Sequence, residues 1–108
     1  MDTMEDTMRF VMADRGSAFS TRDLGIKLLA ELERVEAESD GDHDLILDFD
    51  GVTHISDSFT DEFVCNVVAQ RRSLGLNSPD MQGMSPFVEK IISRAMNARE
   101  MSLTLIAG

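Results

Sequence analysis

The stretch that most constrains the fold is residues 45–63, where an apolar run passes through a short acidic loop into an amphipathic segment. Residues 45–49 lack the apolar and polar alternation of a half-exposed strand, so they predict a strand covered on both faces, typical of a parallel sheet. Phe59, Phe63 and Val67 then recur at the spacing of one helical face. Open α/β folds usually bind their ligands at the carboxyl ends of such strands. We therefore expect any function to lie in the loop between strand and helix.

Two further amphipathic helices flank this stretch. The first is expected to begin with Ser20 as N-cap and Asp23 returning the capping hydrogen bond, with Phe19 packed on Leu24. The second is expected to open at Ser85, which is followed by proline at the first helical position. The predicted buried stripes are Leu24, Leu28, Leu29, Leu32 and Val35 in the first helix and Val88, Ile91, Ile92, Ala95 and Met96 in the second.

Three shorter segments complete the predicted sheet. Residues 8–12 alternate like an edge strand, and residues 81–84 form a short strand in which Gly83 permits a close backbone approach. Residues 103–106 form a final strand. The resulting order, β-α-β-α-β-α-β, predicts an α/β fold with a small, mostly parallel four-stranded sheet and three helices.

Length and charge limit the classes of function. The 108 residues fit one domain, which we place at residues 8–108 behind a flexible polar leader at residues 1–7. A formal charge of −10 argues against nucleic acid or an anionic membrane as the main partner, because either would repel the chain at long range. Residues 1–63 carry a net −12 and the remainder +2, which fits either a basic partner or a solvated acidic face. A single cysteine and no long apolar run predict a cytoplasmic protein.

Asp48 and Asp50 raise an enzymatic alternative. Their spacing resembles the first motif of the haloacid-dehalogenase-type phosphatases, in which the first aspartate attacks phosphorus and the second is the general acid. That chemistry also needs a lysine and further acids that hold magnesium, and the rest of the chain offers no acidic pair at a strand end. We therefore interpret the pair as structural and keep a small aspartate-based phosphatase as the alternative. His43, His54 and Cys65 show no ligand spacing and predict surface histidines and a buried thiol.

The stretch 45–63, whose acidic loop between strand and helix we call the central loop, resembles the STAS-like domain family when it is taken together with residues 19–23. The members of this family are small relatives of the bacterial anti-sigma-factor antagonists. In the family, an apolar strand is followed by Asp, one apolar residue, Ser or a similar residue, and Gly-Val. Residues 48–52 fit this first half of the family's pattern. The family's Asp-Ser-Ser-Gly follows at the start of the next helix. In this alignment Ser56 replaces the family's Asp, Asp57 replaces the phosphorylated Ser, and Ser58 matches the second Ser. The chain therefore has a carboxylate at the phosphoacceptor position.

The resemblance covers residues 8–70 well and implies a non-enzymatic regulatory module that binds a protein partner. In the family that partner is a serine kinase of the histidine-kinase-like ATPase type. The implied binding surface, the switch loop with its neighbours, comprises Arg22, Asp50, Ser56, Asp57, Ser58 and Thr60. Because Asp57 supplies one fixed charge, the resemblance implies either constitutive binding or a displaced phosphoacceptor among the three hydroxyl residues. No cofactor or metal is implied, and a homo-oligomer stays open.

These residues also have structural interpretations. Ser58 and Asp61 have the spacing of a capping box, which alone would explain the polar cluster. Arg22 lies at the second position of the first helix, where a cation opposes the helix dipole. We expect it to pair with an aspartate at the sheet's carboxyl end, namely Asp48, Asp50 or Asp57; a solvated arginine is the other interpretation. A third class of function, sensing of a nucleotide or small anion, is also kept open.

Overall fold

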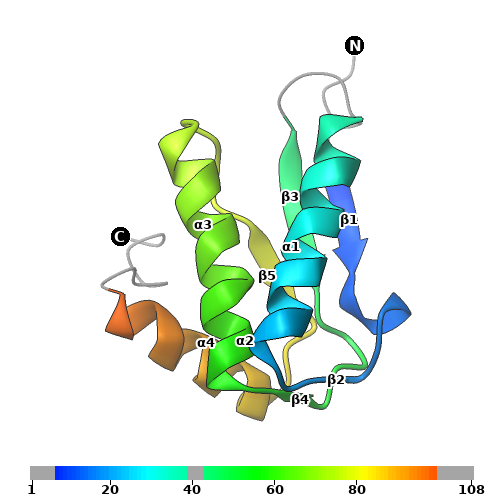
Figure 1. The fold of residues 1–108 in the computed structure, drawn as a ribbon, viewed down its shortest axis with the longest axis vertical. Coiled ribbons are helices and arrows are strands. Elements are labelled where there is room, and N and C mark those ends of the chain that lie inside the picture. The colour runs from blue at the N-terminus through cyan, green and yellow to red at the C-terminus, as the bar shows by residue number, and fades with distance from the viewer. Residues whose placement is uncertain (1–6, 39–42, 100–108) are drawn as a thin grey trace.

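The computed structural model describes residues 7–38 and 43–99 of the chain. In chain order the elements are β1 (Thr7–Val11), the 3-10 helix η2 (Met12–Asp14), β2 (Ala18–Phe19), α1 (Arg22–Ala37), β3 (Asp44–Asp48), β4 (His54–Ile55), α2 (Asp57–Glu62), α3 (Val64–Ser73), β5 (Asp80–Gln82) and α4 (Pro86–Ala98). Figure 1 shows helices and strands alternating along the chain, so the predicted α/β class is confirmed. The predicted strand 103–106 and all but the last residue of the predicted leader lie outside the described residues.

The described strands form two parallel sheets in place of the predicted four-stranded one. Strands β1, β3 and β5 lie in that order, with Leu47 opposite both Phe10 and Met81. Strands β2 and β4 form a separate pair, in which Phe19 lies opposite Ile55. The predicted arrangement is wrong because two-residue strands have no periodicity that a sequence pattern can reveal. The predicted strand near residues 81–84 does exist, as β5.

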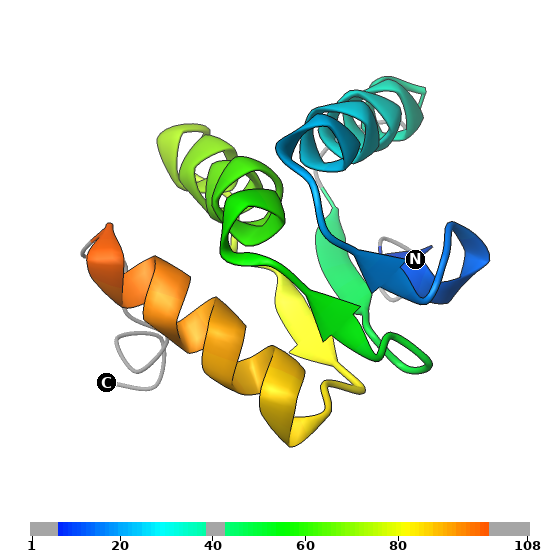
Figure 2. The same ribbon diagram turned by 60° about the horizontal axis from the view of Figure 1, so that its bottom comes forward.

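Within the described part of the chain, helices cover only one face of the β1-β3-β5 sheet. Figure 2 shows α1 and α3 on the same side of this sheet and α4 beside its β5 edge. Leu45 and Leu47 are buried on the helix side, whereas Ile46 and Asp48 are half-buried on the other side, which we call the open face. Arg9 lies on the open face and its Nη1 donates to Asp48 at 2.9 Å. The prediction of a strand covered on both faces is therefore wrong, because an apolar residue on the open face hides the alternation.

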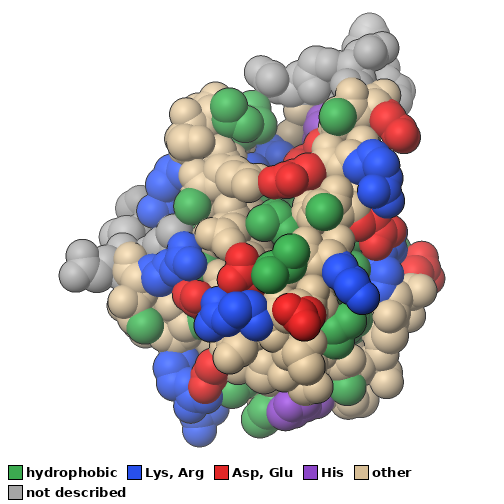
Figure 3. Space-filling view, in the orientation of Figure 1, with side chains coloured by type: hydrophobic (Ala, Val, Ile, Leu, Met, Phe, Trp, Pro, Cys, Tyr) green, Lys and Arg blue, Asp and Glu red, His purple; other side chains and the backbone are tan. Residues whose placement is uncertain are grey.

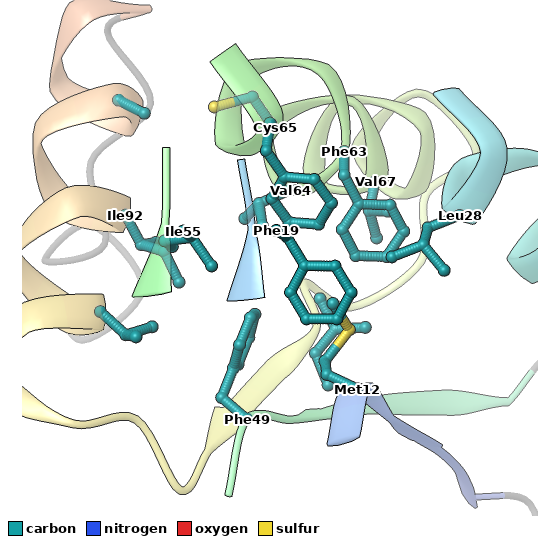
Figure 4. Close-up of a cluster of buried hydrophobic side chains, with 14 of the residues drawn as sticks. Met12, Phe19, Leu28, Phe49, Ile55, Phe63, Val64, Cys65, Val67 and Ile92 are labelled. Atoms are coloured by element: carbon teal, nitrogen blue, oxygen red, sulfur yellow. The ribbon is translucent and has the colours of Figure 1, made fainter. Parts of the chain in front are cut away.

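The hydrophobic core lies between the helices and the sheets. The rings of Phe19, Phe59 and Phe63 stack in a row, with centroid separations of 5.0 and 5.6 Å. Figure 4 shows the side chains of Met12 and Phe49 facing this row from the sheet side. Aromatic pairs in this distance range stabilise a core beyond the area that they bury. The core therefore joins the sheet directly to the start of the helix that follows the central loop.

The predicted helical stripes are largely confirmed. Every residue of the predicted α4 stripe is buried, and the middle of the α1 stripe, Leu28 and Leu32, is buried as well. α4 opens as predicted, because Oγ of Ser85 accepts the backbone N–H of the third helical residue at 3.1 Å. The N-cap of α1 is Thr21 and not Ser20. Both residues carry a hydroxyl group, so the sequence pattern alone does not distinguish them.

The helix predicted from Phe59, Phe63 and Val67 is divided into α2 and α3, which meet at Phe63. The Asn66 side chain donates from Nδ2 to the Glu62 carbonyl oxygen at 2.7 Å, an acceptor that an unbroken helix would use for its own ladder. A side chain inserted in this way is a known cause of helix kinks. Downstream, α3 ends at Ser73, and the chain then turns at Gly75, whose φ of 76° only glycine adopts without cost.

Candidate functional site

The central loop is fixed to the strands on both sides of it. Phe49 N donates to the Gln82 carbonyl of β5 at 2.7 Å, and Ser56 N donates to the Phe19 carbonyl of β2 at 3.0 Å. Gly83 packs directly against the loop, since a methyl group at Gly83 would lie 2.7 Å from the Asp50 nitrogen. The predicted close backbone approach at Gly83 is therefore confirmed. The loop is held in one conformation, and Asp50 at its tip is exposed.

Ser56 and Thr60 are engaged inside the protein. Ser56 is the N-cap of α2, and its Oγ accepts the Phe59 N–H at 3.0 Å. The Thr60 hydroxyl is fully buried and donates to the Ser56 carbonyl at 2.7 Å. The predicted capping box of Ser58 is wrong, because the helix begins two residues earlier than a Ser58 cap requires, at Asp57. Of the three candidate phosphoacceptors, Ser58 alone is exposed.

Asp57, the residue at the family's phosphoacceptor position, is bound by an arginine from α4. Nη2 of Arg94 donates to both carboxylate oxygens of Asp57, at 2.9 and 3.0 Å. Both side chains stay more than half exposed, at 63% for Asp57 and 57% for Arg94. An exposed ion pair of this kind adds less than about 1 kcal/mol to stability. Both charges are therefore available to a partner at little cost to the fold.

A shallow groove lies beside this ion pair, between β4 and α4. Its volume is about 380 Å³, and its lining includes His54, Ser56, Asp57, Phe87, Lys90 and Arg94. The rings of His54 and Phe87 stack with centroids 5.4 Å apart, and Phe87 is 44% exposed. We call these six residues the α4 groove. Our sequence interpretation missed the contribution of α4, although Phe87, Lys90 and Arg94 follow the spacing of a second helical face, away from the buried stripe.

Arg22 does not reach the sheet's carboxyl end. Its Nη1 donates to Glu62 at 2.8 Å and lies 3.5 Å from Asp61 Oδ2, so the expected pairing with an aspartate of the β3 end or the central loop is wrong. Gly25 explains this geometry. A methyl group at Gly25 would lie 2.9 Å from the Glu62 Cβ, so the glycine allows α1 to cross close to α2. Arg22 therefore braces α1 against the end of α2 that is farther from the central loop.

Asp48 and Asp50, the residues of the enzymatic alternative, have separate environments. Oδ1 of Asp48 accepts the Asp50 N–H at 3.0 Å, and Oδ2 accepts Arg9 at 2.9 Å. These bonds, the backbone bond first, lower the pKa of Asp48 below its ordinary value. Each carboxylate oxygen of Asp48 therefore has a structural partner. No group of three or more His, Cys, Asp or Glu side chains suited to a metal ion occurs in residues 7–38 and 43–99.

Acidification is expected to weaken the network around Asp61. The Arg99 hydrogen bond is the main cause that lowers the pKa of Asp61 below its ordinary value of 3.8, with a smaller effect of Arg22. Because the unfolded chain then binds more protons, this contribution is complete above pH 3.8 and is lost as the pH falls through the folded-state pKa. The effect is below about 1 kcal/mol because the carboxylate is partly exposed. Urea unfolding at several acidic pH values should show that the free energy of unfolding falls less steeply with decreasing pH for Asp61→Asn than for the wild type. A matched change of the exposed Asp14 to Asn should leave the pH dependence of the free energy of unfolding as in the wild type, and equal pH dependence for all three proteins would contradict the assignment.

The histidines and the cysteine fall in three different places. Cys65 is buried as predicted, and burial is the main cause that raises the pKa of its thiol. His54 is exposed and lies in the α4 groove. The prediction of a surface residue is wrong for His43, whose side chain is 11% exposed and lies between α1 and α3.

In comparisons with protein-family models, with curated proteins and with solved structures, no match to this chain was found. The STAS-like assignment therefore stays a hypothesis that depends on the residues of the central loop and on the order of the elements. A separate search of residues 7–38 and 43–99 found no helix with the length and apolar character needed to cross a membrane.

Proposed function

We propose that this chain is a small STAS-like regulatory module that is not an enzyme and that binds a protein partner through the central loop, the start of α2 and the α4 groove. By its resemblance to the anti-sigma-factor antagonists, the proposed partner is a serine kinase of the histidine-kinase-like ATPase type. The proposed surface includes α4 in place of Arg22, because Arg22 is paired with Glu62 of α2 and Arg94 of α4 is paired with Asp57.

The observation that supports this proposal most is the exposed Phe87 beside the Asp57–Arg94 ion pair. Phe87 stacks on His54 at the rim of the groove, so its position is fixed although 44% of it is exposed. Binding hot spots are enriched in aromatic residues and arginine that partners bury completely. The α4 groove offers both residue types within one concave surface. A partner segment with an apolar side chain flanked by charges would fit it.

The charges favour constitutive binding over a switch. Asp57 presents one negative charge without modification, and Arg94 holds it in a single orientation. Phosphorylation of Ser56 or Thr60 would first have to break the cap of α2 or expose a buried hydroxyl. Ser58 is exposed, so a displaced acceptor, if used, is Ser58. A phosphate there would add nearly two negative charges next to Asp57.

The test is binding to a purified histidine-kinase-like ATPase from the same genome, measured by calorimetry. We expect Phe87→Ala to weaken binding about 30-fold, the value for a hot-spot loss of about 2 kcal/mol. Leu74→Ala is the matched control, because Leu74 is 72% exposed and lies outside the α4 groove. Equal affinities for the two variants would overturn the proposed surface, and no binding by the wild type would overturn the proposed partner class.

The same mixture with ATP also tests the displaced acceptor. We expect the mass of the peptide that spans residues 56–60 to stay unchanged, because Asp57 occupies the acceptor position. A phosphate on Ser58 would replace constitutive binding by a switch.

A further inference from the structure

A second pocket lies between α1 and α3, away from the α4 groove. Figure 1 shows these two helices diverging from α2 toward their carboxyl ends. The pocket between them has a volume of about 300 Å³, and its lining includes Leu32, Glu36, His43, Val67 and Gln70. His43 precedes β3, whereas the central loop follows it, so the two sites lie at opposite ends of that strand. Figure 3 shows charged and apolar side chains close together along these two helices.

The lining of this pocket combines buried apolar side chains with one highly exposed leucine. Leu32 and Val67 are buried at 1% and 2% exposure and form part of the lining. Leu74, at the end of α3, also lines the pocket but is 72% exposed. Ligand pockets typically combine an apolar surface with a few polar groups and begin at about 300 Å³. The pocket is therefore suited to a small ligand with an apolar body.

One wall carries a histidine that lacks hydrogen bonds. Neither ring nitrogen of His43 has a hydrogen-bond partner among the described residues, although both are buried. Its Nε2 lies 3.6 Å from Oε2 of Glu36, which is beyond hydrogen-bonding distance. Buried polar groups without partners are uncommon in native proteins, and each calls for an explanation. A ligand donor at this wall would reach the Glu36 carboxylate directly, and a turn of the imidazole ring toward the pocket would bring His43 Nε2 to the same donor.

The charges around the wall favour a cation. Glu33 and Glu36 both line the pocket, and Arg71 is the one Lys or Arg among the described residues of its lining. Arg71 is already committed, because its Nε donates to the Asn77 carbonyl at 2.7 Å and its Nη2 to the His43 carbonyl at 2.6 Å. Its Nη1 donates to Glu36 at 3.1 Å. Three of the five N–H groups of Arg71 are therefore used within the protein, and an anionic ligand would meet two carboxylates beside a cation that is already paired with Glu36.

We propose that the pocket between α1 and α3 binds a small amphipathic amine, with its apolar body on Leu32 and Val67 and its ammonium group at Glu36 and His43. The ammonium group donates to the Glu36 carboxylate and to the acceptor nitrogen of the His43 ring. This site does not depend on the proposed function, because it shares no residue with the α4 groove.

The experiment compares three probes that share a phenylethyl body: 2-phenylethylamine, 2-phenylethanol and 3-phenylpropanoate. Binding is followed by two-dimensional NMR of the labelled full chain. We expect saturable shifts at His43 and Val67 with the amine, and affinity about tenfold lower for the propanoate, which corresponds to about 1.4 kcal/mol. We expect Glu36→Gln to abolish the difference between the amine and the alcohol.

The matched control is Glu38→Gln, which removes the same charge from the exposed end of the same helix outside the pocket. Glu33→Gln covers the case in which Glu36→Gln fails to fold. Because Glu33 is exposed, this substitution should lower the affinity for the amine without a change in stability. Equal affinity for amine and propanoate would overturn the charge assignment. The absence of saturable shifts with all three probes, or shifts that depend on protein concentration alone, would overturn the ligand pocket.

Discussion

Replacing Arg71 by leucine is expected to lower the free energy of unfolding by about 3 kcal/mol, the typical cost of removing one partner from a buried ion pair. Arg71 is 3% exposed, and its guanidinium joins three segments of the chain. It donates to the Asn77 carbonyl, the His43 carbonyl and the Glu36 carboxylate. Leucine would leave all three acceptors without this donor. Urea unfolding followed by circular dichroism measures the loss.

Arg72→Leu is the matched control, because the neighbouring arginine is exposed in the same helical turn. It should change stability by no more than about 0.5 kcal/mol, as is usual for surface substitutions. Arg71→Lys keeps the charge but has a single ammonium in place of a planar fork, so its loss should be intermediate. A loss for Arg71→Leu no larger than for Arg72→Leu would show that the guanidinium does not hold the three segments together.

Replacing Gly83 by alanine is expected to cost about 3 kcal/mol, of which about 1 to 2 kcal/mol is the penalty of a left-handed backbone. The φ of Gly83 is 73°, and the added methyl group would lie 2.7 Å from the Asp50 nitrogen. That contact is with backbone, so relief requires the central loop to move. Thermal unfolding measures the cost, and amide chemical shifts of the loop report its movement.

Gly75→Ala separates the two causes. Gly75 has a similar φ of 76°, but no atom lies within 4 Å of the methyl group that alanine would add. It should therefore show the conformational penalty alone, about 1 to 2 kcal/mol, with the loop shifts unchanged. Equal costs at the two glycines would show that the contact between Gly83 and Asp50 has no energetic weight.

The parts of the fold that depend on local sequence patterns could be predicted from the sequence. The α4 stripe, its cap at Ser85 and the turn at Gly75 after α3 each depend on residues close together in sequence. The approach of Gly83 to the central loop was also predictable, because a glycine within a short strand signals such contacts. In the site, the cap of α2 was placed within two residues, although the capping residue is Ser56 and not Ser58.

The parts that depend on how elements pack could not be predicted in the same way. Arg22 pairs with Glu62 because Gly25 lets α1 cross close to α2, and no local pattern contains that crossing angle. Arg71 lies in the last turn of α3, where a cation is expected to face exposed helix carbonyls, whereas its partners come from three separate segments. The pairing of Asp57 with Arg94 likewise joins residues 37 positions apart. Such contacts require the tertiary arrangement itself.

The open face of the β1-β3-β5 sheet has a consequence for self-association. A flat sheet face can pack against the same face of a second copy, as in a β-sandwich. Here Arg9 joins Asp48 and Gln82, and Gln82 joins Asp80, so ionised groups extend across all three strands. Stacking two copies would take these charges out of water, and their desolvation costs several kcal/mol for each ion. The polar network on the open face therefore opposes sheet-to-sheet aggregation through this face.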